Sequence, residues 1–156
     1  MAVVRILVLD GPNLNLVGTR EPHIYGSETL AQIHDRVRAK AAELGVHVDA
    51  YQSNHEGRLI DRLHERDFDG AIVNAGGLTH TSVALRDALL GISRPFVEVH
   101  LSDPSTREPF RQVNFLHDVA IASVVGMGPV GYVQALGILV DHLRGASPSS
   151  GTDAAG

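Results

Sequence analysis

The feature that most constrains the fold is a regular alternation between short apolar runs and longer segments with helical periodicity. The runs are rich in Val, Ile and Leu, and they cover residues 3–9, 46–52, 70–74, 95–101 and 119–125. Near-continuous apolar strands joined by helices are typical of a parallel sheet that is covered on both faces. The sequence therefore predicts an α/β fold built on five parallel strands.

The segments between these runs are expected to be helices. The first covers about 27–44, and Gly45 follows it as a stop signal. Its buried stripe is formed by Leu30, Ile33, Val37, Ala41 and Leu44. Further helices are expected within 55–68, 79–90 and 130–143. The segment from Ser53 to Glu56 has the form of a capping box for the helix that follows it.

The length of the chain limits the architecture. A (β/α)8 barrel ordinarily needs about 250 residues, and this chain has 156. Right-handed crossovers favour an open, doubly wound sheet, and we predict the flavodoxin-like strand order 2-1-3-4-5. A single domain is expected over residues 1–144, followed by a disordered tail over 145–156 that is poor in apolar residues.

Composition excludes several classes of protein. The formal net charge is −5 and the Arg residues are dispersed, which argues against a nucleic-acid partner. No apolar stretch reaches the roughly 18 residues of a membrane span, and the N-terminus lacks the pattern of a secretion signal. The chain has no Cys, so a cytoplasmic location is expected. Lys40 is the single Lys and lies in a charged helical pattern, which gives Schiff-base chemistry little support.

Polar residues are expected to gather at one edge of the sheet. Ligands of doubly wound sheets bind beyond the carboxyl ends of the strands, near the switch point between the first and third strands. The ends of the first, third and fourth strands are followed by Asn13, by Asn74 with His80, and by His100 with Ser102. The sequence therefore predicts a small-molecule site at this edge.

The connection from Asp10 to Gly26 is long for a βα loop, which normally spans about two to six residues. Long loops of this kind are commonly binding or active-site loops, and a solvated insertion is the alternative. Its Tyr25 becomes a base only if a positive charge stabilises the phenolate, and Arg20 is the candidate. Packing against the first helix is the alternative for Tyr25.

The segment from Asn74 to Ser82 combines a polar strand end, two glycines and the start of a helix. Free N–H groups at a helix start favour an anion, so a carboxylate suits this place. An ordinary capped turn is equally compatible with the glycines. Asn74 is harder to dismiss, because a polar side chain that closes a buried strand must find partners.

Glu98, His100 and Ser102 share one face of the fourth predicted strand, because side chains alternate with a period of two. A carboxylate beside a histidine fixes its tautomer and favours its protonated form, which suits a general acid near neutral pH. A structural histidine is the alternative, and the pairing with Glu98 favours catalysis. The remaining histidines are expected to be surface or packing residues: His23, His34, His47, His55, His64, His117 and His142.

Arg107 and Arg111 follow this strand and can each hold a substrate carboxylate with two hydrogen bonds. A solvated charge cluster is equally compatible with Arg107. A solvated position is less compatible with Arg111 if a helical turn directs its side chain toward the site.

Three uncommon motifs occur in order along the chain. The first begins at Gly11 and reads Gly-Pro-Asn-Leu-Asn-Leu-x-Gly-x-Arg-Glu-Pro-x-x-Tyr-Gly; the others are Thr-His-Thr-Ser at 79–82 and Glu-Val-His-Leu-Ser at 98–102. Together they closely resemble the type II 3-dehydroquinate dehydratases, over about residues 6–143. The resemblance implies a flavodoxin-like fold, no cofactor and a trimer-based dodecamer. It also implies anti elimination of water from 3-dehydroquinate, through an enolate, to give 3-dehydroshikimate in the shikimate pathway.

The resemblance implies roles for particular residues. Tyr25 resembles the base that removes the C2 proton, Arg20 the cation that favours its phenolate, and His100 the acid that protonates the departing hydroxyl. Asn13 resembles the residue that holds the water stabilising the enolate. The residues that resemble the substrate-binding set are Asn74, His80, Leu101, Ser102 and Arg111. Asp87 resembles the residue that a neighbouring subunit contributes in a homododecamer, a tetramer of trimers.

Two departures from the family pattern concern the turn after the third strand and a peripheral aromatic residue. The family often has Asn-Pro-Gly-Ala where this chain has Asn-Ala-Gly-Gly at 74–77, and Phe115 stands where an aromatic hydroxyl is common.

Other functions of flavodoxin-like folds are weighed against the same residues, because a fold alone does not fix function. A phospho-acceptor domain is expected to close its third strand with Asp and its fifth with Lys, but this chain has Asn74 and no Lys at these places. A flavin-binding module needs a hydroxyl-rich phosphate loop, and the loop after the first strand has one Thr. A metal hydrolase is the third alternative, although no pair of His residues has the spacing of a helical metal motif.

Overall fold

Five parallel strands form the centre of the molecule. The structure is a computed structural model and describes residues 2–19, 22–25 and 27–145. The strands are β1 (Arg5–Asp10), β2 (His47–Gln52), β3 (Gly70–Asn74), β4 (Phe96–His100) and β5 (Ala122–Val125). Their order is β2-β1-β3-β4-β5 and every pairing is parallel, which confirms the flavodoxin-like prediction. Residues 146–156 of the expected tail lie outside the described residues.

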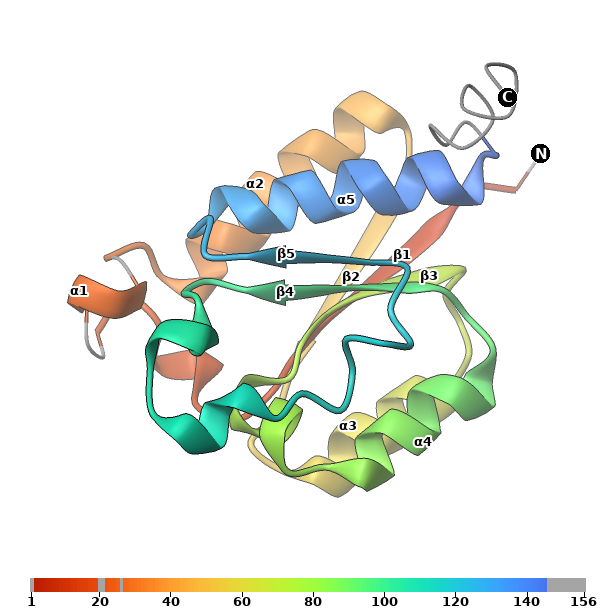
Figure 1. Cartoon of the computed structure of the whole chain (residues 1–156). Helices are drawn as coiled ribbons and strands as arrows, with labels where there is room; N and C mark the ends of the chain where they lie inside the picture. Colours follow the sequence, from red (N-terminus) through yellow and green to blue (C-terminus); the bar gives the residue numbers. More distant parts are fainter. Residues whose placement is uncertain (1, 20–21, 26, 146–156) are drawn as a thin grey trace, which may run out of the picture.

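Four helices cover the two faces of the sheet (Figure 1). They are α2 (Leu30–Leu44), α3 (Glu56–His64), α4 (Val83–Ile92) and α5 (Val130–Leu143). Helices α2 and α5 lie on one face, and α3 and α4 lie on the other. A single turn, α1 (Pro22–Tyr25), lies on the side to which the carboxyl ends of β4 and β5 point. No helix in the described part of the chain is long and apolar enough to span a membrane.

Local signals explain the ends of α2 and correct one prediction. Thr29 caps the helix: its Oγ1 accepts the Gln32 N–H, while Gln32 Oε1 accepts the Thr29 N–H, so the capping box lies here. Gly45 ends the helix in the left-handed region, as predicted. The capping box predicted at residues 53–56 is wrong. Ser53 Oγ accepts the His55 N–H in a tight turn, and the Glu56 carboxylate instead accepts from Ser82.

The central strands supply alternate side chains to two separate cores. Ile6 and Val8 of β1 pack with α2 and α5, whereas Leu7 and Leu9 pack with α3 and α4. All four are almost completely buried, and each such burial stabilises the fold by about 1.5–3 kcal/mol. These two cores hold the strands in register, so that Asp10 and Asn74 stand opposite each other where β1 and β3 end. The polar chemistry of the molecule begins at this edge.

Candidate active site

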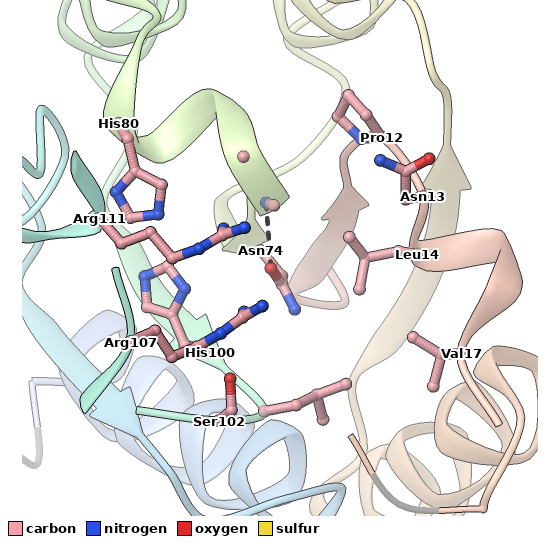
Figure 2. A pocket seen from close by; sticks show the side chains of 13 residues that line it. Pro12, Asn13, Leu14, Val17, Asn74, His80, His100, Ser102, Arg107 and Arg111 are labelled. Carbon is pink, nitrogen blue, oxygen red and sulfur yellow. Dashed lines mark hydrogen bonds between the residues drawn. The ribbon is translucent and has the colours of Figure 1, made fainter. Parts of the chain in front are cut away.

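A pocket of about 150 Å³ opens at the carboxyl ends of β1, β3 and β4. In Figure 2, Asn13 and Leu14 from the loop after β1 face His80, His100 and the two arginines across the pocket, with Asn74 between the two sides. Seven residues predicted from the sequence line it together: Asn13, Asn74, His80, His100, Leu101, Ser102 and Arg111. Arg107, for which two interpretations were open, lines it as well.

Three predicted residues do not appear in this lining. Arg20 lies outside the described residues, and for Tyr25 the structure describes the backbone of α1 but not the side chain. Asp87 lies on the exposed side of α4, outside the pocket.

The loop after β1 is tied closely to the turn after β3. The Gly11 N–H donates to the Asn74 carbonyl at 2.8 Å, and a Cβ at Gly11 would collide with the Ala75 carbonyl. Asn13 then adopts a left-handed φ of 71°, which Asn tolerates better than most residues. Its N–H donates to the Asn54 side chain at 2.9 Å. Only glycine at position 11 permits this approach, so the first motif fixes one side of the pocket.

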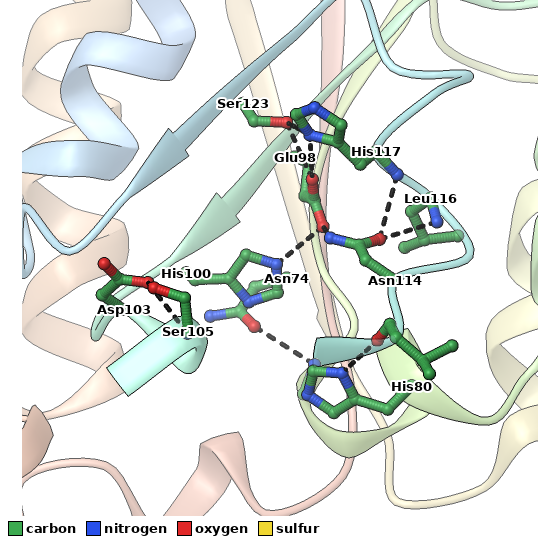
Figure 3. Close-up of polar contacts among 12 residues, drawn as sticks. Asn74, His80, Glu98, His100, Asp103, Ser105, Asn114, Leu116, His117 and Ser123 are labelled. Carbon is green, nitrogen blue, oxygen red and sulfur yellow. Dashed lines mark hydrogen bonds and ion pairs between the residues drawn. The ribbon is translucent and has the colours of Figure 1, made fainter. Parts of the chain in front are cut away.

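The turn after β3 differs from the predicted helix start. Residues Gly76–His80 form a 3-10 helix, and α4 begins only at Val83, with Ser82 as its cap. The predicted helix start at residue 79 is therefore wrong, and the start of α4 does not line the pocket. Gly76 and Gly77 of the 3-10 helix line it instead, and a carboxylate bound at this segment stays a prediction. His80 Nδ1 lies 2.6 Å from the Val113 carbonyl, so this nitrogen carries the proton and Nε2 is left for a ligand (Figure 3).

His100 is paired with a buried carboxylate. Its Nε2 lies 2.7 Å from Glu98 Oε2, and the exposed fractions of the two side chains are 8% and 1%. This contact engages Nε2 and leaves Nδ1 as the ring nitrogen that can act on a ligand in the pocket. The prediction that Glu98 and His100 act as a pair is confirmed in its geometry.

Glu98 is held by a set of donors that the sequence did not reveal (Figure 3). Asn114 donates to Oε2 at 2.6 Å and Ser123 donates to Oε1 at 2.7 Å. His117 is exposed, as expected of a surface residue, but its Nδ1 lies 3.6 Å from Oε1 and 3.0 Å from Ser123 Oγ, which the sequence did not reveal. Burial raises the pKa of Glu98, but the hydrogen bond and charge of His100, with the bonds from Ser123 and Asn114, lower it to about 2. Glu98 is therefore a carboxylate at neutral pH.

Two guanidinium groups complete this side of the pocket. Arg111 Nε donates to Glu108 at 2.6 Å, and its guanidinium lies 5.3 Å from the centre of the Phe110 ring. The hydrogen bond from Arg111 lowers the pKa of the Glu108 carboxyl. Arg107 and Arg111 lie beside His100 in Figure 2, so positive charge gathers where an acidic ligand can be held.

A second polar cluster lies behind Asn74, and sequence analysis missed it. The side chain of Asn74 donates to the Tyr132 hydroxyl, which donates to Asp10, and Asp10 pairs with His34. His34 was expected to be a surface or packing residue, and this interpretation is wrong. The polar ending of an otherwise apolar strand at Asp10 was the available signal.

Two rival chemistries find little in the described residues. Lys40 lies on α2 with its ammonium 3.4 Å from Glu43, outside the pocket lining. Within residues 2–19, 22–25 and 27–145, no group of three or more His, Cys, Asp or Glu side chains is arranged to hold a metal ion.

Comparison with known proteins agrees with this geometry. The family model described as "Dehydroquinase class II" matches residues 4–140. The chain belongs to the class II dehydroquinase family. The chain is 55% identical over 140 residues to a protein of Bordetella avium named "3-dehydroquinate dehydratase", covering 88% of this chain and 97% of that protein. It is 50% identical over 143 residues to "Catabolic 3-dehydroquinase 2" of Neosartorya fischeri, covering 90% and 95% of the two chains.

A solved structure of the family has the same fold. The crystal structure of a type II dehydroquinase from Butyrivibrio crossotus superposes with a TM-score of 0.84 at 38% identity. It covers 91% of this chain and 98% of its own. The class II dehydroquinase architecture thus accounts for nearly the whole described domain.

Proposed function

We propose that this chain is a hydro-lyase that removes water from 3-dehydroquinate by anti elimination and releases 3-dehydroshikimate. The observation that carries the proposal is the contact of the buried Glu98 carboxylate with His100, which lines the pocket of a class II dehydroquinase. The Glu98 carboxylate holds the His100 ring through Nε2 and leaves Nδ1 for the pocket, so His100 is placed to give a proton to a departing hydroxyl. The named relatives support the choice of substrate.

The reaction proceeds in two steps, removal of a proton and loss of water. The Tyr25 phenolate, stabilised by Arg20, takes the C2 proton, and the electron pair of the broken C–H bond forms the enolate. The enolate then collapses into the carbon–carbon double bond as the carbon–oxygen bond breaks. His100 gives its proton to the leaving oxygen, which departs as water. The roles of Tyr25 and Arg20 rest on the first sequence motif.

The other pocket residues bind the substrate and its enolate. Asn13 holds the water that stabilises the enolate oxygen. The substrate is bound by Asn74, His80, the Leu101 backbone, Ser102 and Arg111. These assignments are supported by the seven predicted residues that line one pocket. The chemistry requires no cofactor, and the shikimate pathway supplies the substrate; the cytoplasmic location stays a prediction.

A test of this function uses the purified chain, 3-dehydroquinate and the ultraviolet absorbance of the conjugated enone product. Turnover is expected in the presence of a chelator, and it should survive borohydride treatment with substrate because no imine forms. The Tyr25→Phe variant should lose at least about 10²-fold in turnover while still binding substrate. A parent chain without turnover would reject the proposal. Near-parental turnover of Tyr25→Phe would reject the role of Tyr25 as the base.

We further propose a homododecamer, a tetramer of trimers, in which Asp87 reaches a neighbouring site. Asp87 is exposed on α4, and two apolar residues of the same helix, Val83 and Leu90, are each 51% exposed, as suits a contact surface. Sedimentation should give a species far heavier than 16.7 kDa. Asp87→Ala should raise KM by about 10-fold with little loss of melting temperature. An active monomer would contradict this proposal.

A further inference from the structure

Asp10 is a buried acidic side chain that the proposed reaction does not use. It is the last residue of β1, and none of its surface is exposed. Its Oδ2 lies 2.7 Å from His34 Nε2 on α2, and its Oδ1 accepts from the Tyr132 hydroxyl on α5 at 2.6 Å. A buried carboxylate is stable only when it is paired and hydrogen-bonded, and these two contacts supply both conditions.

The contact with Asp10 fixes the direction of the Tyr132 hydroxyl. An ionised carboxylate only accepts hydrogen bonds, so the single hydroxyl proton of Tyr132 points to Asp10. Burial raises the pKa of Tyr132 well above its usual value, and the charge of Asp10 raises it further, so this proton is retained. The oxygen of Tyr132 is then left as an acceptor only, and it accepts from Asn74 Nδ2 at 2.9 Å.

The amide of Asn74 is consequently fixed at both ends. Its Nδ2 donates to Tyr132, and its Oδ1 accepts the Gly76 N–H at 3.2 Å (Figure 2). In a reversed amide, Nδ2 would face the Gly76 N–H, donor against donor. Oδ1 would face the Tyr132 oxygen, acceptor against acceptor, so both contacts would be repulsive. One N–H and one lone pair of the amide are left for the pocket, in a fixed arrangement.

We propose that Asp10 and Tyr132 are positioning residues that set the orientation of the Asn74 amide toward the substrate, while His34 contacts the second carboxylate oxygen of Asp10. This inference rests on the proposed function, because it gives Asn74 a substrate to bind. A purely structural role, in which the same bonds only fasten α5 to the sheet, is the alternative. The two roles differ in one respect: a positioning residue changes kcat/KM only through Asn74.

A double-mutant cycle separates these roles. Tyr132→Phe removes the hydroxyl that orients the Asn74 amide. It should lower kcat/KM by about 10-fold, mainly by raising KM, because Asn74 binds the substrate and the two residues are energetically coupled. In an Asn74→Ala background the same change should cost less than about 2-fold. Tyr51→Phe, which removes a hydroxyl from a half-buried tyrosine of β2, is the matched control and should leave kcat/KM within about 2-fold. Equal losses in both backgrounds, or no loss in either, would overturn the proposal.

A second variant covers the case in which Tyr132→Phe does not fold. Asp10→Asn keeps the shape of the side chain but lets either end of an amide face Tyr132, so the hydroxyl direction is no longer imposed. We expect a loss of about 3-fold in kcat/KM that disappears in the Asn74→Ala background. The same loss in both backgrounds, or none, contradicts the positioning role for this variant as well.

Failure of the proposed function and failure of this inference give different results. A parent chain that does not convert 3-dehydroquinate rejects the function. The positioning claim is then decided by a crystal structure of Tyr132→Phe, or of Asp10→Asn if the first variant does not fold. We expect the Asn74 side chain to rotate or to occupy two conformers. A single Asn74 conformer in its original place rejects the inference.

Discussion

Two buried carboxylates lie behind the pocket, and they act on it in different ways. Glu98 touches its pocket residue directly, with 2.7 Å between its Oε2 and His100 Nε2. Asp10 reaches its pocket residue only through a hydroxyl, because Tyr132 stands between it and Asn74. The first arrangement can hold and stabilise a proton on an imidazole, whereas the second can only orient an amide. The comparison shows that the role of a buried carboxylate depends on the group it contacts. Contact with an imidazole supports proton transfer, whereas contact with a hydroxyl orients the next side chain.

A third pair shows why burial matters to this difference. His47 and Asp49 of β2 are also two residues apart and also bonded, at 2.9 Å, but their side chains are 46% and 39% exposed. The hydrogen bond from His47 lowers the pKa of Asp49. Because both side chains are partly exposed, solvent weakens their interaction. The exposed pair of His47 and Asp49 therefore serves as a comparison for the buried pair of Glu98 and His100.

The largest expected effect comes from removing the proton donor. His100→Asn should lower kcat by about 10²- to 10⁴-fold, the range for a positioned acid, while the fold is retained. The matched variant His47→Asn breaks the exposed pair and should keep kcat within about 2-fold. Steady-state kinetics of both variants measure this difference. Similar kcat values for the two variants would show that the buried pair has no special role.

The buried position of Glu98 should also appear in stability. Its pKa is about 2 in the folded chain against an ordinary value of 4.5, so ionisation favours folding above pH 4.5, and this contribution is lost as the pH falls through 2. A shift of this size corresponds to about 3 kcal/mol at neutral pH. Urea unfolding of the parent and of Glu98→Gln, at fixed protein concentration, measures it. The difference between the two proteins should shrink between about pH 5 and pH 2; a constant difference would refute this linkage.

The outer members of the Glu98 cluster should matter least. His117 is 70% exposed and lies 3.6 Å from Glu98, so solvent weakens its contribution. His117→Ala should change kcat/KM by less than about 2-fold, whereas Asn114→Ala, which removes a 2.6 Å donor, should have the larger effect. Measuring kcat/KM for both variants gives their order. The reverse order would place the important contact at the surface end of the cluster.

The sheet and much of the pocket could be predicted from the sequence because their signals are local. Apolar runs with β-branched residues gave the five strands, and the rule for doubly wound sheets brought Asn13, Asn74 and His100 to one edge. The alternation of side chains placed Glu98 beside His100. The strands and the pair of Glu98 and His100 follow from neighbours within a few residues, and the fold rule then brings together strand ends that are far apart in the chain.

The supporting clusters could not be predicted, because they depend on packing between distant segments. Tyr132 and Asp10 are 122 residues apart, and their contact depends on how α5 lies across β1. Nothing in the sequence of the helix expected over 130–143 distinguishes Tyr132 from an apolar packing position. Asn114 likewise reaches Glu98 from a loop without a periodic pattern. The capping box expected at Ser53 failed because its Glu56 found a partner on another segment.

The kcat of Glu98→Gln, compared with that of Asp10→Asn, tests the central claim most directly. His100 gives a proton in the proposed reaction, and the Glu98 carboxylate is the group that contacts its Nε2. Replacing this carboxylate should lower kcat by at least about 10-fold, while Asp10→Asn should act mainly through KM and keep kcat within about 2-fold. This result would separate the support of proton transfer by Glu98 from the orientation of Asn74 by Asp10. An unchanged kcat in Glu98→Gln, or an equal loss of kcat in both variants, would contradict the account.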